Sequence, residues 1–346
     1  MSTPTRPSLV PHWLALAEEL VGRAAPRLDA LNLFPVPDAD TGTNMLATLT
    51  AARTAADACP AQDDAGAVLA HAGAAALDSA RGNSGMLLAV SLAGMAEPLR
   101  GRERVDAFAL AAAFGAADRA ARQALSDPRE GTILTVLSAA ARSLARSSTQ
   151  APDTPAVAGD ADPAVRLGPA VTVMLADCVQ AVEETESLLA PLTRAHVVDA
   201  GAVGLLWVFE ALRAVVTGTP VDEELATALH GYVEGAHAAE GEPAAAAEEP
   251  TEGAVEVMGT LALTPLAAAE LRRRLTDVGD AVILAPVGTA RDAQGRVPWR
   301  VHVHVPRAED AIGPLRAAGD VEGLAVTDLA EPSHGDDAAP DGCHGR

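Results

Sequence analysis

Helical periodicity over the first two thirds of the chain constrains the fold more than any other feature. Across residues 8–237, apolar residues recur at spacings of three and four, alanine is abundant, and β-branched alternation is scarce. Trp13, Leu16 and Leu20 show this spacing, and prolines and glycines punctuate the successive stretches. A chain of 346 residues is typical of about two domains. We therefore expect the first domain, residues 1–237, to be helical.

The pattern changes after an acidic run that is rich in alanine and proline. Residues 238–254 have the composition of a flexible linker. Beyond it, strands are predicted over residues 255–263, 281–287, 299–305 and 321–327, and helices over residues 264–278 and 310–318. The sequence thus predicts a small α/β domain over residues 255–330 and a disordered tail over residues 331–346.

The charge balance excludes several classes of partner. The chain has 47 acidic and 25 basic residues, a formal net charge of −22, and only 2% aromatic residues. Such a chain has little with which to neutralise a phosphate backbone or stack on bases, so we expect no nucleic-acid partner. The apolar stretches are short or interrupted by charge, so we expect no direct membrane insertion. All the basic residues are arginine, so any phosphate must be bound by metal, arginine or backbone amides.

The cysteines indicate a reducing compartment. Cys59, Cys178 and Cys343 are widely spaced and form no C-x-x-C pair, which is typical of a reduced chain rather than of a disulfide scaffold. The first residues show no apolar core of a signal peptide. We therefore expect a cytoplasmic location.

Two carboxylates lie one residue apart in the segment NLFPVPDADTGTNM, residues 32–45. Asp38 and Asp40 offer the oxygen ligands that a hard cation such as Mg²⁺ prefers, in a turn stiffened by two prolines. Thr41 or Thr43 can cap the helix that follows, whose first amides favour phosphate. An ordinary Asp-rich turn that caps a helix is the alternative interpretation.

Three further segments place glycines or an acid at expected helix starts. Residues 79–86 (SARGNSGM) set two glycines around Asn-Ser, where the backbone can approach an anion closely. Residues 130–136 (EGTILTV) begin another helix, and residues 197–206 (VVDAGAVGLL) put an acid beside glycines at a third helix start. Taken singly, each segment is also explained by an ordinary turn or helix cap.

Taken together and in this order, the four segments resemble those of the bacterial fatty acid kinase ATP-binding subunit, whose N-terminal domain is similar to the L subunit of dihydroxyacetone kinase. The resemblance covers most of residues 8–220 and extends into the second domain through GDAVILAP and WRVHVHVP. It implies a mainly α fold, an antiparallel helical barrel that holds ATP at one end through Mg²⁺, followed by the small α/β domain. The resembling subunit continues with a third, C-terminal domain, so this form is expected to be shortened at the C-terminus.

The resemblance also implies roles for individual residues. Asp38 and Asp40 would be the Mg²⁺ ligands and the catalytic acids, and Asn32 lies near the position of a third aspartate in the ketone kinases. Arg81 is a candidate for stabilising transition-state charge, and an exposed helix-end arginine is the alternative. The residues expected to line the phosphate and nucleoside site are Thr43, Asn44, Gly82, Asn83, Ser84, Gly85, Thr132 and Asp199.

In the resembling kinases, a separate DegV-like subunit binds a fatty acid and presents its carboxylate for phosphorylation to an acyl phosphate. A carboxylate is already ionised at neutral pH, so we assign no general base. Two other functions stay open: phosphorylation of a dihydroxyacetone-type metabolite, and nucleotide sensing without catalysis. The Asp-Thr-Gly form of the turn is nearer to the fatty acid kinases than the Asp-His-Gly form of the ketone kinases. A homodimer is also compatible with the sequence.

Two histidines alternate with valines on a predicted strand of the second domain. His302 and His304 therefore project from one face, an arrangement that suits Zn²⁺, although a Zn²⁺ site normally has about four ligands. The resembling domain carries a cysteine on its first strand as a further ligand, and here the corresponding stretch offers only Glu256. We expect a pair of half-exposed strand histidines rather than a Zn²⁺ site.

Overall fold

The computed structural model describes residues 9–102, 104–149, 163–232 and 254–329. Nearly all of the expected linker, residues 238–254, and all of the expected tail, residues 331–346, lie outside these ranges. The first part of the chain forms the helices α1 (Leu9–Leu31), α2 (Thr41–Ala58), α3 (Ala65–Ser79), α4 (Gly82–Gly94), α5 (Ala96–Leu99), α6 (Ala107–Ala124), α7 (Ile133–Thr149), α8 (Pro163–Leu188), α9 (Ala190–Ala195) and α10 (Ala200–Thr217). We call this part the helical unit.

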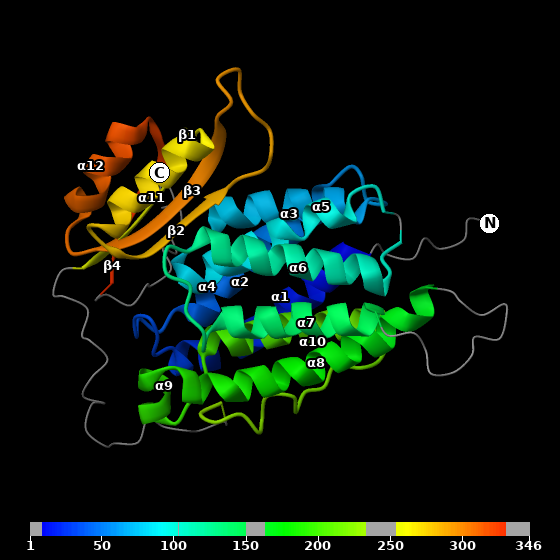
Figure 1. The fold of residues 1–346 in the computed structure, drawn as a ribbon. Helices are drawn as coiled ribbons and strands as arrows, with labels where there is room; N and C mark the ends of the chain where they lie inside the picture. Colours follow the sequence, from blue (N-terminus) through cyan, green and yellow to red (C-terminus); the bar gives the residue numbers. More distant parts are fainter. Residues whose placement is uncertain (1–8, 103, 150–162, 233–253, 330–346) are drawn as a thin grey trace, which may run out of the picture.

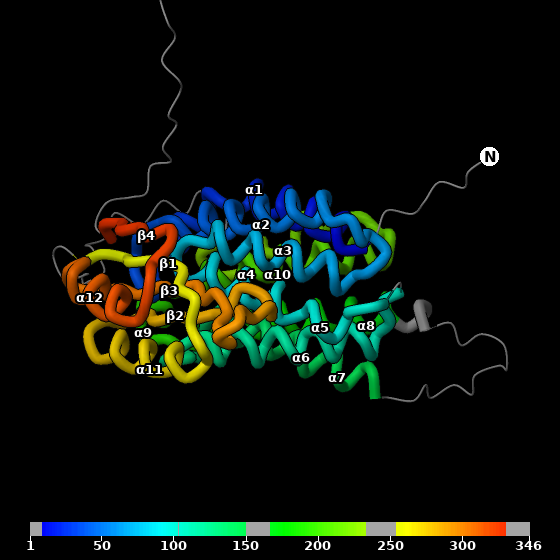
Figure 2. Tube along the Cα trace, turned by 90° about the horizontal axis from the view of Figure 1, so that it is seen from above, coloured from blue at the N-terminus to red at the C-terminus, as the bar shows by residue number. Residues whose placement is uncertain are grey.

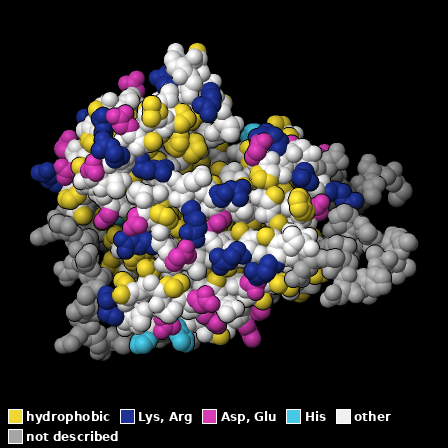
Figure 3. Space-filling view, viewed as in Figure 1, with side chains coloured by type: hydrophobic (Ala, Val, Ile, Leu, Met, Phe, Trp, Pro, Cys, Tyr) yellow, Lys and Arg dark blue, Asp and Glu magenta, His cyan; other side chains and the backbone are white. Residues whose placement is uncertain are grey.

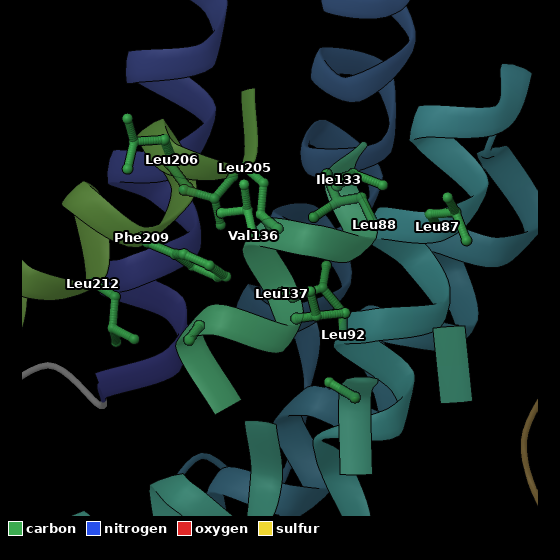
Figure 4. Packing of buried hydrophobic residues seen from close by; sticks show 14 of the residues in the cluster. Leu87, Leu88, Leu92, Ile133, Val136, Leu137, Leu205, Leu206, Phe209 and Leu212 are labelled. Carbon is green, nitrogen blue, oxygen red and sulfur yellow. The ribbon is translucent and has the colours of Figure 1, made fainter. Parts of the chain in front are cut away.

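The helices of this unit close into an antiparallel barrel, as the sequence predicted. α1 packs on α2, α2 on α3 and α4, α4 on α6, α6 on α7, α7 on α8, α8 on α10, and α10 returns to α1. Figure 4 shows the interior, where Leu88, Leu137 and Phe209 project from α4, α7 and α10 toward one another. Alanine and glycine allow the close approach: a Cβ on Gly42 would lie 2.4 Å from the carbonyl oxygen of Ala25.

Helix α10 lies in the middle of this packing. By length and composition it could cross a membrane, but 78% of its apolar window is buried inside the protein, as in the core helix of a globular domain. Its Glu210 is fully buried and pairs with Arg213 at 2.6 Å, so the charge is compensated where it lies. No other helix in the described part of the chain passes the same test.

The second part of the chain forms a four-stranded antiparallel sheet with two helices, which we call the α/β unit. Its elements are β1 (Val255–Leu263), α11 (Pro265–Thr276), β2 (Asp280–Pro286), β3 (Val297–Val305), α12 (Ala308–Ala318) and β4 (Val321–Asp328), and the strand order is β2-β3-β1-β4. Each element agrees with its predicted range to within three residues. Alternation along the strands turns Val257, Val301 and Val303 toward α11 and α12.

The opposite face of the sheet meets the helical unit. Met258, Ile283 and Ala285 join the core of the helices, and the Ser126 amide donates a 3.0 Å hydrogen bond to the carbonyl of Val282. Figures 1 and 2 both show the α/β unit lying over one end of the helices. This arrangement places strands β1 and β3 next to the starts of α2 and α4, where the acidic and glycine-rich segments lie.

Candidate functional site

The acid pair lies in the turn between α1 and α2. Asp38 and Asp40 are half-buried, and the residue between them, Ala39, has a φ of 54°. This left-handed conformation costs a non-glycine residue about 1 kcal/mol or more, so the surrounding packing must hold the turn in place. The side-chain amide of Asn32 donates a 2.5 Å hydrogen bond to Oδ1 of Asp38. The amide of Asn44 hydrogen-bonds Asp40 from the first turn of α2.

The two carboxylates are close enough to disturb each other's charge. Burial raises the pKa of Asp38 to about 7, the negative charge of Asp40 adds to this, and the hydrogen bond from Asn32 opposes it. Burial also raises the pKa of Asp40, with the charges of Glu256 and Asp29 in the same direction. The two side chains share a hydrogen bond. The pair therefore favours a bound proton or a cation between its oxygens.

The sequence analysis missed Asp29, near the end of α1. Its Oδ1 accepts hydrogen bonds from the Gly42 amide at 2.6 Å and the Thr43 amide at 3.1 Å, and its Oδ2 accepts one from the Thr43 hydroxyl at 2.8 Å. The expectation that Thr41 or Thr43 caps α2 is therefore wrong, because the aspartate of the neighbouring helix takes these amides. Nothing in the local sequence marks Asp29, since the contact depends on how α1 crosses α2.

The start of α4 adds backbone groups to the site. Gly82 has a φ of +58°, and a Cβ there would lie 2.5 Å from Nδ2 of Asn44, so glycine is required by both conformation and space. Its amide donates a 3.0 Å hydrogen bond to Oε1 of Glu256 on β1. Gly85 has a different role: a Cβ there would lie 2.8 Å from Oγ1 of Thr48, so this glycine lets α4 approach α2.

Three residues of the sheet form a second cluster beside the acid pair. Nδ1 of His302 lies 2.9 Å from Oε1 of Glu256, and the rings of His302 and His304 lie 4.8 Å apart between centroids. His302 is fully buried and His304 is 6% exposed, so the expectation of half-exposed histidines is wrong. The reason is that this face of the sheet is covered by the helical unit, a contact that strand periodicity alone does not reveal.

The charges of this cluster differ from those of the acid pair. Burial alone would raise the pKa of Glu256, but the hydrogen bond and charge of His302, with help from the Gly82 amide, lower it to about 2. Burial lowers the pKa of His304 to about 3, and the charge of His302 acts in the same direction. His304 is therefore neutral at pH 7, and the 3.8 Å approach of Asp280 to its Nδ1 is not an ion pair there.

One donor atom from each residue of the sheet cluster lies within 4.8 Å of the others, close enough to hold one metal ion. Nε2 of His302 and Nδ1 of His304 are buried and have no hydrogen-bond partner among the described residues.

The two clusters face one small cavity of about 30 Å³, which has room for on the order of one water molecule. The helical unit and the α/β unit both contribute to its walls. The lining residues are Asn32, Pro35, Val36, Asp38, Asp40, Thr41, Asn44, Gly82, Asn83, Ser84, Glu256, His304, Thr327, Asp328 and Leu329.

Seven of the predicted site residues thus meet at this cavity, and five others do not line it. Arg81 is exposed, Thr43 contacts Asp29, and Gly85 packs on α2. Thr132 accepts a 3.3 Å hydrogen bond from the Leu134 amide at the start of α7. Asp199 is the fifth, and the roles assigned to all twelve residues stay predictions.

Asp199 is buried at the start of α10. Its Oδ2 accepts a 2.8 Å hydrogen bond from the Ala202 amide, and burial raises its pKa to about 7 despite this bond. It lies close to the start of α4, because a Cβ on Gly201 would contact both Oδ2 of Asp199 at 3.2 Å and Oγ of Ser84 at 2.9 Å. The start of α10 thus packs against Ser84, which lines the cavity, whereas Asp199 and Gly201 do not line it.

Comparison with known proteins places this arrangement in a family. The model of the DAK2 domain matches residues 35–214, more than half of the chain, and includes all or most of each of the four segments. Protein YloV of Bacillus subtilis (strain 168) is 33% identical over 211 residues, which are 61% of this chain and 35% of that protein. The uncharacterized protein SH1689 of Staphylococcus haemolyticus (strain JCSC1435) is 32% identical over 195 residues, 56% of this chain and 33% of that protein.

The matched part of the chain thus spans about a third of the length of these curated relatives. What the whole relatives do is therefore a separate question from the identity of the helical unit. The helical barrel, the acid pair and the match over residues 35–214 agree with one another, and this chain belongs to the DAK2 domain family, the kinase-related domains of the dihydroxyacetone kinase L type.

Proposed function

We propose that this protein is an ATP- and Mg²⁺-dependent phosphotransferase subunit. The observation that carries the proposal is the pair Asp38 and Asp40, two half-buried carboxylates that share a hydrogen bond and line the same cavity. Their oxygens, with the amide oxygens of Asn32 and Asn44, are the donors that Mg²⁺ prefers. The residues present therefore fit the metal, and Asp38, Asp40 and Asn32 would hold it.

A bound Mg²⁺ would supply charge neutralisation for phosphate oxygens. The chain contributes the rest of the chemistry. Asn32 and Asn44 fix the two carboxylates by hydrogen bonds, and the left-handed Gly82 brings the amides at the start of α4 toward the cavity. Positioning and electrostatics of this kind provide most of the catalysis of phosphoryl transfer, and they need no lysine.

For the acceptor, we propose a fatty acid carboxylate presented by a DegV-like partner in the cytoplasm. The carboxylate oxygen would form a bond to the γ-phosphorus of ATP, the bond from that phosphorus to the β-γ bridging oxygen would break, and ADP would leave. No proton has to move, which agrees with a site in which no general base is assigned. The resemblance of the four motif segments to the fatty acid kinase subunit supports this acceptor.

We further propose that Glu256, His302 and His304 hold a Zn²⁺ ion. The fit rests on the buried ring nitrogens that have no hydrogen-bond partner among the described residues, and on the neutral form of His304, because a neutral imidazole is the form that binds metal. A carboxylate with two imidazoles is also a common protein ligand set for Zn²⁺. The zinc would lie between the sheet and the helical unit and would stabilise the contact between them.

One observation favours a regulatory function as the second candidate. The carboxylate of Glu256 accepts the hydrogen bond of the Gly82 amide, so this amide is not free to bind phosphate. The cavity of about 30 Å³ is also too small for a triphosphate. Nucleotide binding would then require β1 and β3 to move away from α2 and α4. A nucleotide-sensing module that signals through the position of its α/β unit would use the same movement without catalysis.

Calorimetric titration of ATP into the purified protein, with and without Mg²⁺, tests the shared first step. We expect binding only with Mg²⁺, and its loss in Asp38→Ala. Asp57→Asn, at the exposed far end of α2, is the matched control and should bind like the wild type. Equal binding by wild type and Asp38→Ala would overturn the proposed site.

The acceptor requires a separate assay. Release of ADP should depend on a fatty-acid-loaded DegV-like protein if the acyl proposal is right, and on dihydroxyacetone if the ketone alternative is right. ATP binding that is Mg²⁺-dependent, without turnover on either acceptor, would favour the sensing function.

A further inference from the structure

A second, larger cleft lies between the two units, away from the acid pair. It has a volume of about 710 Å³ and is bounded by α4 and α6 on one side and by α11 and β2 on the other. Its walls are mostly small and apolar, with Val90, Ala120, Ala124 and Ala268 among them. Val90 is eight residues along α4 from Gly82, so the cleft begins about 12 Å from the site described above.

Arg272 of α11 lines this cleft and has no carboxylate partner among the residues that the structure describes. Its Nη1 donates a 2.6 Å hydrogen bond to the carbonyl of Gln123, and its Nη2 donates a 3.0 Å hydrogen bond to the carbonyl of Leu284. Its Nε is buried and unpartnered. The nearby acid of the cleft, Asp277, is engaged by Arg273 at 3.3 Å. Within the described part of the chain, the guanidinium group of Arg272 is therefore held between the two units by neutral carbonyl groups.

Burial lowers the pKa of Arg272, and no neighbouring charge opposes the effect. The chain carries a formal charge of −22, whereas the cleft lining contains two arginines and one acid. On the face shown in Figure 3, arginine and acidic side chains are interspersed and do not form a basic patch. A partly buried cation in apolar surroundings normally has an anionic partner.

We propose that the cleft binds a small amphipathic anion, with a carboxylate or phosphate head group at Arg272 and an aliphatic body along the alanine-lined walls of α6 and α11. The volume lies within the range of about 300–1,000 Å³ that is usual for small-molecule sites. Both units contribute walls, so the ligand would bridge them. The proposal does not depend on the phosphotransferase function, because binding here needs neither ATP nor Mg²⁺.

Dodecanoate and dodecyl phosphate below their critical micelle concentrations are the probes, with dodecanol and dodecyltrimethylammonium as neutral and cationic counterparts. Binding is measured calorimetrically on the full chain without nucleotide or metal. Trp299 lines the cleft, whereas Trp13 and Trp207 lie in the core of the helical unit, so tryptophan emission gives a second readout. The preferred head group distinguishes a carboxylate ligand from a phosphate ligand.

Two variants test the two halves of the site. Arg272→Gln should weaken binding of the anionic probes by about 10-fold or more, since hydrogen bonds to charged groups contribute about 1.5–3 kcal/mol. Arg274→Gln is the matched control, because Arg274 lies on the same helix, pairs with Glu270 and does not line the cleft. Arg272 also links the units, so Ala269→Phe provides an independent test: Ala269 is exposed and lines the cleft, and a larger side chain there would narrow it.

Binding of both or either anionic probe, weakened by Arg272→Gln and by Ala269→Phe but not by Arg274→Gln, would support the proposal. Three results would overturn it: no anionic binding up to about 1 mM, equal affinity for dodecanol or the cationic probe, or unchanged affinity in Ala269→Phe with the melting temperature preserved.

Discussion

The acid pair of the helical unit and the Glu256 cluster of the sheet face the same cavity but hold their carboxylates in opposite states. Burial raises the pKa of Asp38 and Asp40, with no cation to oppose it, whereas His302 lowers the pKa of Glu256 to about 2. Burial is the first cause in all three cases, so burial does not distinguish them. The difference lies in the neighbouring groups. Asp38 lies beside a second carboxylate, that of Asp40, whereas Glu256 lies beside the imidazole of His302.

This difference determines what each cluster can bind. The acid pair offers only oxygen donors, and the described side chains that hydrogen-bond it or shift its pKa values are Asn32, Asn44 and other acids, which favours a hard cation such as Mg²⁺. The sheet cluster mixes one carboxylate with two imidazoles, which favours a borderline cation such as Zn²⁺. Two metals of different kinds could therefore occupy neighbouring sites without competing for the same donors.

The largest expected effect comes from breaking the sheet cluster. Glu256→Ala should lower the free energy of unfolding by about 3 kcal/mol, because His302 is buried and loses its partner. The same variant should lose bound zinc, from about one ion per chain to none, since three donors become two. Calorimetric melting and elemental analysis measure the two effects.

His71→Ala, at an exposed histidine on α3, controls for the loss of any one metal-binding side chain. If Glu256→Ala kept both its zinc and its melting temperature, Glu256 would neither bind the metal nor stabilise the buried His302. The pH gives a further check: because the pKa of Glu256 is lowered, its stabilising contribution is present above about pH 4.5 and is lost as the pH falls toward 2.

A smaller effect is expected at the acid pair, where function and stability oppose each other. Asp38→Asn should weaken Mg²⁺-dependent ATP binding by about 100-fold, since one of the two anionic ligands is lost. In metal-free protein at pH 8, the same variant should raise the melting temperature, because it removes the buried charge and its repulsion with Asp40, which together raise the pKa of Asp38 to about 7. Asp57→Asn should change neither quantity.

The pH dependence follows from the sign of this shift. In the metal-free protein, the folded state keeps a proton on Asp38 that the unfolded state has lost, so the free energy of unfolding should fall as the pH rises from about 4 to about 7. Over the same interval, Mg²⁺ competes with that proton, so its affinity should rise toward pH 7 and level off above it. A wild-type stability profile that is flat from pH 4 to 7 would show that the pair is not strained.

The sequence was sufficient to predict what local patterns encode. The helical spacing of residues 8–237 and the alternation of β3 predicted the helices and the small sheet, because each element buries one face, and the family resemblance implied the barrel. The turn with Asp38 and Asp40 was recognised for the same reason: its donors are adjacent in the chain. Seven residues predicted from two motif segments do line one cavity.

What the sequence did not predict depends on contacts between distant segments. Asp29 caps α2 only because α1 and α2 cross closely at Gly42, and His302 is buried only because the sheet packs on the helices. Arg272 carries no motif, and its lack of a carboxylate partner is a property of the boundary between the two units. These features require the packing of whole elements, which spacing along one element cannot supply.

The smallest effect in this comparison concerns the backbone that connects the two clusters. The Gly82 amide donates a hydrogen bond to Glu256 of the sheet cluster. Gly82 also lies against Asn44, whose side chain hydrogen-bonds Asp40 of the acid pair, so Gly82 contacts both clusters. Gly82→Ala should destabilise the protein by about 2 kcal/mol, part from the positive φ of 58° and part from the contact with Asn44.

Gly218→Ala separates the two causes of that loss. Gly218 has a similar φ of +68°, but a Cβ there would meet nothing within 4 Å, so its substitution should cost only the conformational part, about 1 kcal/mol. The difference between the two variants, measured by urea unfolding, isolates the displacement of Asn44. Gly82→Ala should also weaken Mg²⁺-dependent ATP binding, whereas Gly218→Ala should not. Equal stability losses and unchanged ATP binding in both variants would mean that Gly82 serves only the turn and does not couple the sheet cluster to the acid pair.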